Sequence, residues 1–229
     1  MRKLIPLLLL AAVLLAGCNK TDSVTYTGIE AGTLGSGVFV SDNGVRMYVV
    51  GNESNFDVSE TRRVVIKYQT HPITDPDHIE IDLQGLMQAI IREPFPVDAL
   101  DDEPSGSPIE VDDAWFSGGY LNLLVAAEGK DYNKHLCSAN YTAGEDGIVI
   151  RLRHDNHEEN AAGSNSGLTA FLSLPMYEPQ VSYEHYALSI GLKQPFPVAV
   201  TLQWSSTTLD GGPLTLYERK GSYTPATAD

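Results

Sequence analysis

Short runs of alternating apolar and polar residues dominate the chain beyond residue 25 and predict an all-β protein. Ile79, Ile81 and Leu83 alternate with Glu80 and Asp82, a pattern that buries one face of a strand and wets the other. The pattern of residues 86–91 fits either a strand or a short helix. The other expected strands are 37–40, 45–50, 62–68, 111–116, 120–126, 136–141, 148–152, 168–174, 186–192, 198–204 and 214–217. Strands this short and this regularly spaced are typical of an antiparallel sandwich.

A change in composition divides the strand-rich part of the chain in two. Residues 93–108 contain four prolines and five acidic residues, and no periodic apolar pattern crosses them. We therefore predict a small β domain over 26–95, an acidic, Pro-rich linker over 96–108 and a β-sandwich domain over 109–229. Domains of these sizes are large enough to hold separate cores.

The first 17 residues have the features of a secretory signal peptide that ends at a lipoprotein cleavage site. Arg2 and Lys3 precede the apolar run Leu4–Leu15, which is too short to span a bilayer. Leu-Ala-Gly-Cys follows directly and resembles the lipobox of bacterial lipoproteins. We therefore predict a signal peptide over 1–17, lipidation of Cys18 and a lipidated tether over 18–25, so that the protein meets its membrane through lipid.

Charge and cysteine content exclude several classes of protein. The full chain of 229 residues has a net charge of −15, and loss of residues 1–17 leaves 13 basic against 30 acidic residues, a net charge of −17. Nucleic acid is therefore not an expected partner. Lipidation uses Cys18 and leaves Cys137 alone, so no intramolecular disulfide is expected. Asn19, rather than Asp, after the lipidated residue favours the outer membrane, with the periplasmic face or the cell surface left open.

One segment resembles a known family. Residues 115–123 read Trp-Phe-Ser-Gly-Gly-Tyr-Leu-Asn-Leu, and with the lipobox, the small β domain and the strand 62–68 they resemble the NigD-like lipoproteins of Bacteroides and relatives. The resemblance implies an OB-like five-stranded barrel followed by a C-terminal β-sandwich. It implies no catalytic residues, and the family's name comes from a bacteriocin-associated gene cluster.

Three groups of side chains are candidates for metal binding or catalysis, and each has a simpler structural explanation. His154 and His157 are separated like a pair of metal ligands, but they begin a polar run that fits an exposed loop. The acidic residues Asp98, Asp101, Asp102 and Glu103 match no calcium loop. His135 and Cys137 share a strand face, where an unpaired cysteine is more often packed than reactive. We therefore expect no metal and no cofactor, with His154 and His157 as weak candidates.

Aromatic residues and one serine complete the candidate sites. Trp115 and Tyr120 flank Gly118-Gly119, where a tight turn favours packing of the rings in the sandwich, with a sugar-binding platform as the alternative. Asp22-Ser23-Val24 resembles a short acceptor sequence for O-glycosylation, so Ser23 is a candidate for modification.

Taken together, these features favour a binding protein over an enzyme. An anchor, a tether and two β domains are predicted, whereas no set of nucleophile, acid and base is recognisable. We expect a non-catalytic cell-envelope lipoprotein whose partner is an envelope protein or a glycan. A glycan-binding accessory lipoprotein is the more specific alternative, and a hydrolase is the least favoured.

Overall fold

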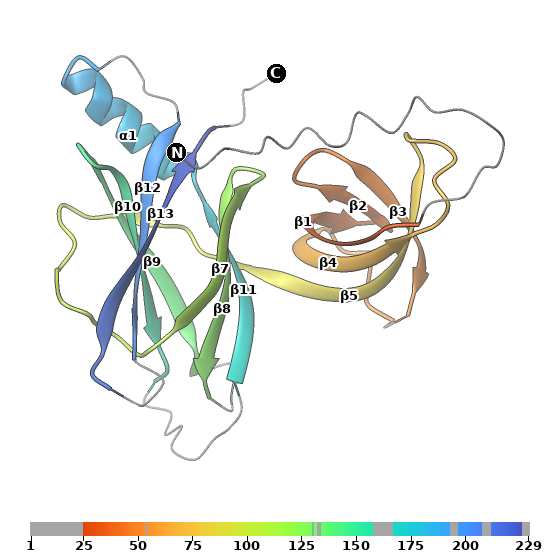
Figure 1. Ribbon diagram of the computed structural model, residues 1–229, viewed down its shortest axis with the longest axis horizontal. Coiled ribbons are helices and arrows are strands. Elements are labelled where there is room, and N and C mark those ends of the chain that lie inside the picture. The colour runs from red at the N-terminus through yellow and green to blue at the C-terminus, as the bar shows by residue number, and fades with distance from the viewer. Residues whose placement is uncertain are drawn as a thin grey trace, which may run out of the picture.

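The structure is a computed structural model, and it describes residues 25–53, 55–129, 131, 134–157, 167–192, 197–207 and 212–225. The prediction of an all-β chain is confirmed, because strands form almost all of the regular structure in these residues (Figure 1). Cys18 and Ser23 lie outside the described residues, so the lipidation and glycosylation sites stay predictions.

The N-terminal domain is a barrel made by the first five strands. These are β1 (Thr27–Gly35), β2 (Val38–Ser41), β3 (Arg46–Asn52), β4 (Arg62–Thr70) and β5 (Ile79–Ile91). They are ordered β3-β2-β1-β4-β5, and a parallel pairing of β3 with β5 closes the ring. The predicted alternation in β5 is confirmed, because Ile81 and Leu83 are fully buried in the barrel core with Phe39 and Ile66. The OB-like classification of this barrel stays a prediction.

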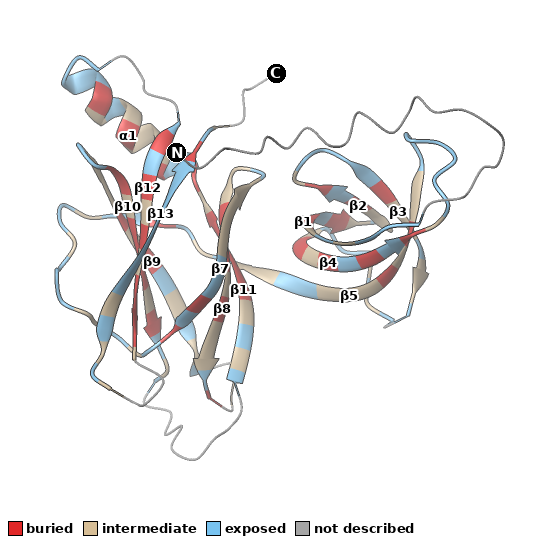
Figure 2. Ribbon diagram, viewed as in Figure 1, coloured by how far each residue is buried: buried red, intermediate tan, exposed pale blue. Residues whose placement is uncertain are grey.

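The C-terminal domain is a sandwich of two sheets with its own core. One sheet contains β7 (Glu110–Ser117), β8 (Tyr120–Glu128) and β11 (Gly167–Pro175). The other contains β6 (Phe95–Pro96), β9 (Leu136–Gly144), β10 (Gly147–Asp155), β12 (Val198–Ser206) and β13 (Thr215–Tyr223). Buried residues occur along the strands of both sheets (Figure 2), and their side chains form one hydrophobic core. The second sheet is mixed rather than purely antiparallel, because β10 and β12 run parallel, as do β6 and β9.

The connection between the domains differs from the predicted one. Strand β5 leaves the barrel and pairs through Ala89–Ile91 with β11, so it belongs to both domains (Figure 1). Residues 96–108, predicted as an interdomain linker, instead lie along the sandwich. Within them, the N–H of Val97 donates to Tyr141 O, and that of Ser107 to His154 O at 2.7 Å. The prolines and acidic residues correctly indicated that the strand pattern ends there. They did not indicate that the segment is hydrogen-bonded to the second sheet.

The expected strand at 186–192 is wrong. Residues Tyr177–Ser189 form helix α1, which packs on the sandwich through Pro179, Tyr183 and Ala187. These buried positions recur every fourth residue, as one face of a helix requires. The alternating apolar residues from Tyr186 to Leu192 misled the prediction, because Leu188, Ile190 and Leu192 are exposed. Among the described residues, no helix has the length and apolar character needed to span a membrane.

The shared strand predicts that the barrel and the sandwich unfold together. Both tryptophans, Trp115 and Trp204, belong to the sandwich and report on it, whereas Val64 and Ile66 are buried in the barrel. We expect the denaturant midpoint from tryptophan fluorescence to coincide with the loss of amide protection at Val64 and Ile66. Opening of the barrel at a clearly lower denaturant concentration would show that the two domains are independent.

Candidate functional site

Residues 115–123, which we call the family-like segment, form a tight hairpin that faces the barrel. Strands β7 and β8 are joined by Gly118 and Gly119, whose φ angles are +57° and +80°, as the sequence predicted for this turn. A Cβ atom on Gly118 would overlap with Asp42 Oδ1, whereas one on Gly119 would meet nothing within 4 Å. The turn therefore needs glycine for its backbone, and Gly118 also lets the barrel approach.

The barrel covers the outer face of the sheet that contains β8 and β11. Along β8, Leu121 and Leu123 point into the sandwich core, so Asn122 between them points outward. Likewise Leu172 and Leu174 of β11 belong to the core, and Ser173 lies on the opposite face. Asn122 and Ser173 are nonetheless fully buried, because the barrel shields them from solvent.

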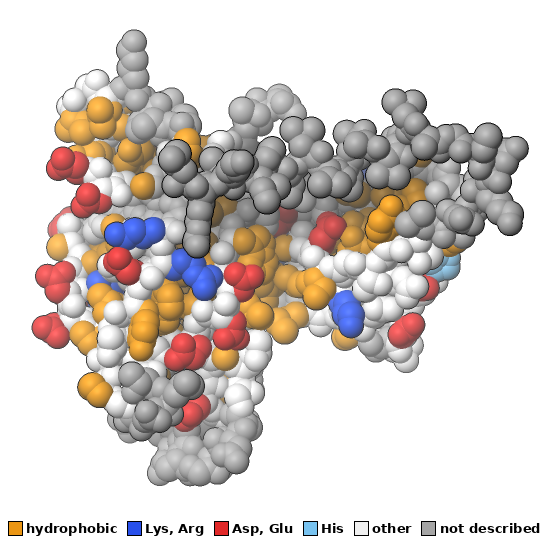
Figure 3. Space-filling view, in the orientation of Figure 1, with side chains coloured by type: hydrophobic (Ala, Val, Ile, Leu, Met, Phe, Trp, Pro, Cys, Tyr) orange, Lys and Arg blue, Asp and Glu red, His pale blue; other side chains and the backbone are white. Residues whose placement is uncertain are grey.

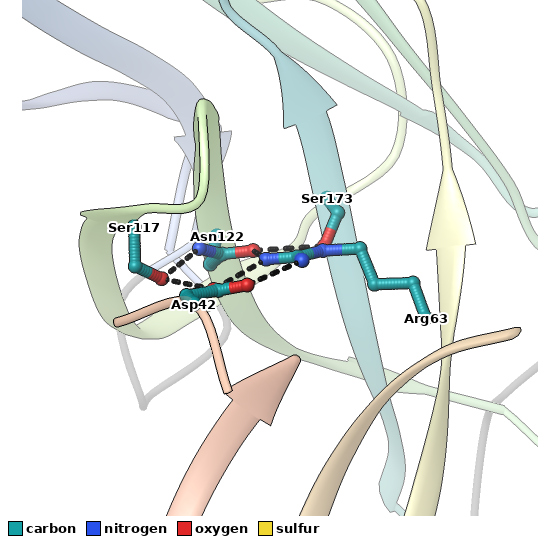
Figure 4. A network of polar contacts seen from close by, with 5 residues as sticks. All are labelled: Asp42, Arg63, Ser117, Asn122 and Ser173. Atoms are coloured by element: carbon teal, nitrogen blue, oxygen red, sulfur yellow. Dashed lines mark hydrogen bonds and ion pairs between the residues drawn. The ribbon is translucent and has the colours of Figure 1, made fainter. Parts of the chain in front are cut away.

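Arg63 of β4 crosses this interface and joins the two domains (Figure 4). Its Nη1 and Nη2 atoms donate to the two carboxylate oxygens of Asp42, each at 2.8 Å. Nη2 also donates to Asn122 Oδ1 at 2.9 Å, and Nε donates to Ser173 Oγ at 2.9 Å. Ser117 of the hairpin donates its hydroxyl proton to Asp42. We call these five residues the junction network.

The junction network fixes the charge state of Asp42. The side chains of Arg63 and Asp42 are only 6% and 7% exposed. Burial by itself raises the pKa of Asp42, but the hydrogen bonds from Arg63 and Ser117 and the guanidinium charge outweigh it. The pKa of this carboxyl therefore lies below its ordinary value, and at neutral pH the network holds a buried ion pair with hydrogen bonds on both partners.

Both weak ligand-binding candidates lie at this junction rather than in the sandwich core. The guanidinium of Arg63 stands 4.0 Å from the ring centroid of Tyr120, close enough for a cation–π interaction. Trp115 is half-buried on the outer face and stacks on Phe171, with ring centroids 5.8 Å apart. The expectation that Trp115 packs inside the sandwich is therefore wrong, because its side of β7 faces the barrel.

A groove borders the junction network where the two domains diverge. It has a volume of about 320 Å³ and is bounded by residues 29–31 of β1, Asp42 and Asn43 of the β2–β3 turn, Val65 of β4 and residues 115–117 of β7. We call it the junction groove. Its position between two domains and its size are those of many ligand-binding sites.

The histidine candidates are placed apart from each other. His154 is buried in β10, where Nδ1 lies 2.9 Å from Pro108 O and Nε2 lies 2.9 Å from Nδ1 of His135. Burial lowers the pKa of His154, so the ring is neutral at pH 7. His157 is exposed in the following turn. Within the described parts of the chain, no three His, Cys, Asp or Glu residues group as a metal site would require.

The remaining candidates have structural partners. Burial raises the pKa of the Cys137 thiol to about 11, which keeps it protonated and a poor nucleophile at neutral pH. Asp101 forms an ion pair of 3.2 Å with Arg153, and its backbone carbonyl accepts a hydrogen bond from Arg151. This carbonyl and carboxylate fasten the acidic segment to the sandwich.

Most members of the junction network were not predicted as site residues from the sequence. Asp42, Arg63, Asn122 and Ser173 come from four separate elements, and no local spacing relates them. One signal was present, since Asn122 interrupts the otherwise apolar run Leu121–Val125. A lone polar residue in such a run is a buried hydrogen-bonding group or faces another domain.

Removal of the negative charge from the junction network should destabilise the whole protein. Asp42→Asn leaves the Arg63 guanidinium buried without a counter-charge, which typically costs about 3–5 kcal/mol. We expect this loss in denaturant unfolding at pH 7.

The same substitution has a predicted pH dependence. The pKa of Asp42 is depressed in the folded state, so the stability it provides is present above the unfolded value of about 3.9 and is lost as the pH falls through the folded value. The stability difference between the two proteins should therefore shrink below about pH 4. A constant difference down to pH 2 would contradict the ion-pair explanation.

The two turn glycines separate backbone strain from the domain contact. Gly118→Ala and Gly119→Ala both place a side chain at positive φ, with a shared cost of about 1 kcal/mol. Only the Gly118 variant also displaces Asp42, so it should lower the melting temperature more. Equal losses for the two variants would show that the hairpin does not press against the barrel.

Comparisons with known proteins cover both domains. Residues 94–184 match the family described as the NigD-like C-terminal beta sandwich domain. A NigD-like immunity protein from Bacteroides caccae has a similar structure, with a TM-score of 0.60 at 18% identity over 88% of this chain and 97% of that one. No curated protein matches the chain.

Two further solved structures have the same fold. A protein of unknown function from Bacteroides vulgatus matches with a TM-score of 0.56 at 16% identity, over 88% of this chain and 92% of that one. A Bacteroides fragilis protein that is provisionally named a lipoprotein matches with a TM-score of 0.54 at 14% identity, over 85% of this chain and 97% of that one. Residues 94–184 are therefore similar to the NigD-like C-terminal beta sandwich domain, and the predicted resemblance of the chain to the NigD-like family is confirmed.

Proposed function

We propose that the protein is a non-catalytic lipoprotein of the cell envelope that binds a macromolecular partner at the junction between its two domains. The observation that carries this proposal is the junction network. It uses the polar groups of the family-like segment to hold barrel and sandwich together, and it leaves a groove beside them. A rigid pair of domains with a groove between them suits recognition, because little ordering is needed on binding.

The proposed anchor is lipid on Cys18 in the outer membrane. The sequence around Cys18 supports it, as does the fold shared with a protein provisionally named a lipoprotein. Thr25, where the described chain begins, comes seven residues after Cys18, and seven extended residues reach about 25 Å. Such a tether would keep the barrel close to the membrane surface, with the sandwich joined to it through β5.

The polar side chains at the junction support binding rather than catalysis. The carboxylate of Asp42 and the guanidinium of Arg63 are hydrogen-bonded to each other and to neighbouring side chains in a buried ion pair, which is a structural role rather than that of an acid or base. The Cys137 thiol is protonated at neutral pH. A structurally similar protein is named an immunity protein, and a partner that is itself a protein fits that name.

A glycan is the second candidate partner, and one observation favours it. The half-buried indole of Trp115 borders the junction groove beside Asn43, and an aromatic ring next to an amide is a common platform for a sugar.

The lipid anchor is tested by Cys18→Ser. Without the thiol, no diacylglycerol can be attached, so the variant should leave the detergent phase in a phase-partition assay, whereas the wild-type protein stays in it. Quantitative recovery of the variant in the detergent phase would exclude lipid at Cys18 as the anchor.

Binding is tested in the same envelopes by photocrosslinking. A photoreactive residue at position 29, in the junction groove, should give a discrete crosslinked product with the anchored protein. The same residue at position 50, on another exposed face of the barrel, should give none. Equal labelling from both positions would argue against a partner at the junction.

A further inference from the structure

The junction groove is bordered by the edges of two strands. It touches three consecutive residues of β1, Ile29 to Ala31, and three of β7, Trp115 to Ser117. Consecutive side chains of a strand point to opposite faces, so a cavity that meets all three lies against the strand's edge. Hydrophobic side chains gather on the surface where the barrel meets β7 (Figure 3).

The edge of β7 that faces away from β8 carries backbone groups that do not pair with β8. In a hairpin with a two-residue turn, Ser117 and Tyr120 exchange both backbone hydrogen bonds, and so do Trp115 and Asn122. The N–H and C=O groups of Phe116 and Ala114 therefore point away from β8. The Ala114 N–H donates to the carboxylate of Asp113 at 2.8 Å. No strand among the described residues pairs with this side of β7.

The first half of β1 has a similar open side. Strand β2 pairs with β1 only over Gly32–Gly35, and the Ala31 carbonyl accepts a hydrogen bond from the N–H of Asp42. The backbone groups of Ile29, two residues earlier, point to the same side as this carbonyl. In the described chain no strand pairs with them there. The groove thus lies between two rows of backbone donors and acceptors.

The side chains around the groove determine which chemical groups of a ligand it can bind. Ile29 is 69% exposed and lines the same groove as Trp115, so it offers an apolar contact. Exposed Asp112 and Asp113 follow along β7 away from the groove, in a chain with a net charge of −15, and Asp113 forms an ion pair of 3.5 Å with Arg219. The bulge between Val111 and Asp113 disrupts pairing there, so a new strand has regular backbone only over Ala114–Ser117.

We propose that the junction groove binds an extended, cationic segment of a partner protein, which adds to β7 as a new edge strand. This inference rests on the proposed binding function and names the kind of segment that is bound. Main-chain hydrogen bonds to the Ala114 carbonyl and to the N–H and C=O groups of Phe116 provide the affinity. An apolar side chain packs against Ile29 and Trp115, and a basic side chain reaches the exposed carboxylate of Asp112. This carboxylate and the net negative charge of the chain give the preference for a cationic segment.

The proposal is tested with the detergent-solubilised full chain and a synthetic probe. The probe is an acetylated heptapeptide that alternates lysine and valine and carries a neutral dye for fluorescence anisotropy. We expect saturable binding at low ionic strength. A peptide of the same sequence with alternate backbone nitrogens methylated keeps the charges but cannot pair as a strand, and it should bind at least tenfold more weakly.

Matched protein variants locate the site. Ile29→Lys places a cation in the groove and should weaken binding at least tenfold, whereas Val50→Lys makes the same change at a 53% exposed position on β3 and should leave binding within twofold. Both positions are exposed, so the two variants should keep the wild-type melting temperature. Amide exchange at Phe116 should slow when the peptide is bound, which charge attraction alone would not cause.

Three results would overturn the proposal. Equal binding of the methylated peptide, or equal weakening by the two lysine variants, would mean non-specific attraction of a basic peptide to an acidic protein. Absence of peptide binding, with a change of indole fluorescence on addition of maltoheptaose, would assign the groove to a glycan. None of these results changes the detergent partition of the wild-type protein, so failure of the groove is distinguishable from failure of the anchor.

Discussion

The buried charge of Arg63 is the constraint on which the arrangement of the two domains depends. An arginine withdrawn from water is tolerated only when its donors are satisfied and its charge is balanced. Asp42 balances the charge from within the barrel, but the sandwich supplies Asn122 and Ser173, which complete the hydrogen bonds. Separation of the domains would leave the Arg63–Asp42 pair without part of its hydrogen-bonding shell. The junction is therefore part of the fold and not a contact between two finished domains.

The covalent path of the chain reinforces this junction. Strand β5 contributes Ile81 and Leu83 to the barrel core and Ala89–Ile91 to the edge of a sandwich sheet. A twist or shift of the barrel would strain the β5–β11 pairing and the Arg63 contacts at once, because both cross the same interface. The outer face of that sheet consequently carries buried polar residues whose hydrogen bonds are made within the protein. On an exposed sheet face, water would provide these hydrogen bonds.

The sequence was sufficient for features that depend on local periodicity and insufficient for those that depend on a second domain. Alternation identified the buried face of β5, and the paired glycines identified the β7–β8 turn, because both are properties of neighbouring residues. Helix α1 was missed where the alternating residues 186–192 imitated a strand. The inward or outward direction of Trp115 was not predictable, because the bulge in β7 shifts the alternation and because a barrel encoded far upstream covers that face.

The same reasoning explains why an open strand edge can persist beside the junction. Exposed edges favour aggregation and are usually blunted. In β7 the bulge and Asp112 and Asp113 blunt the first half of the edge, whereas the second half is recessed next to the barrel, with Ile29 and Val65 alongside. The barrel beside this half of the edge would hinder the approach of the broad edge of another folded sheet more than that of a single extended segment. An edge that is protected from association with other sheets but accessible to one strand has the geometry of a selective binding site.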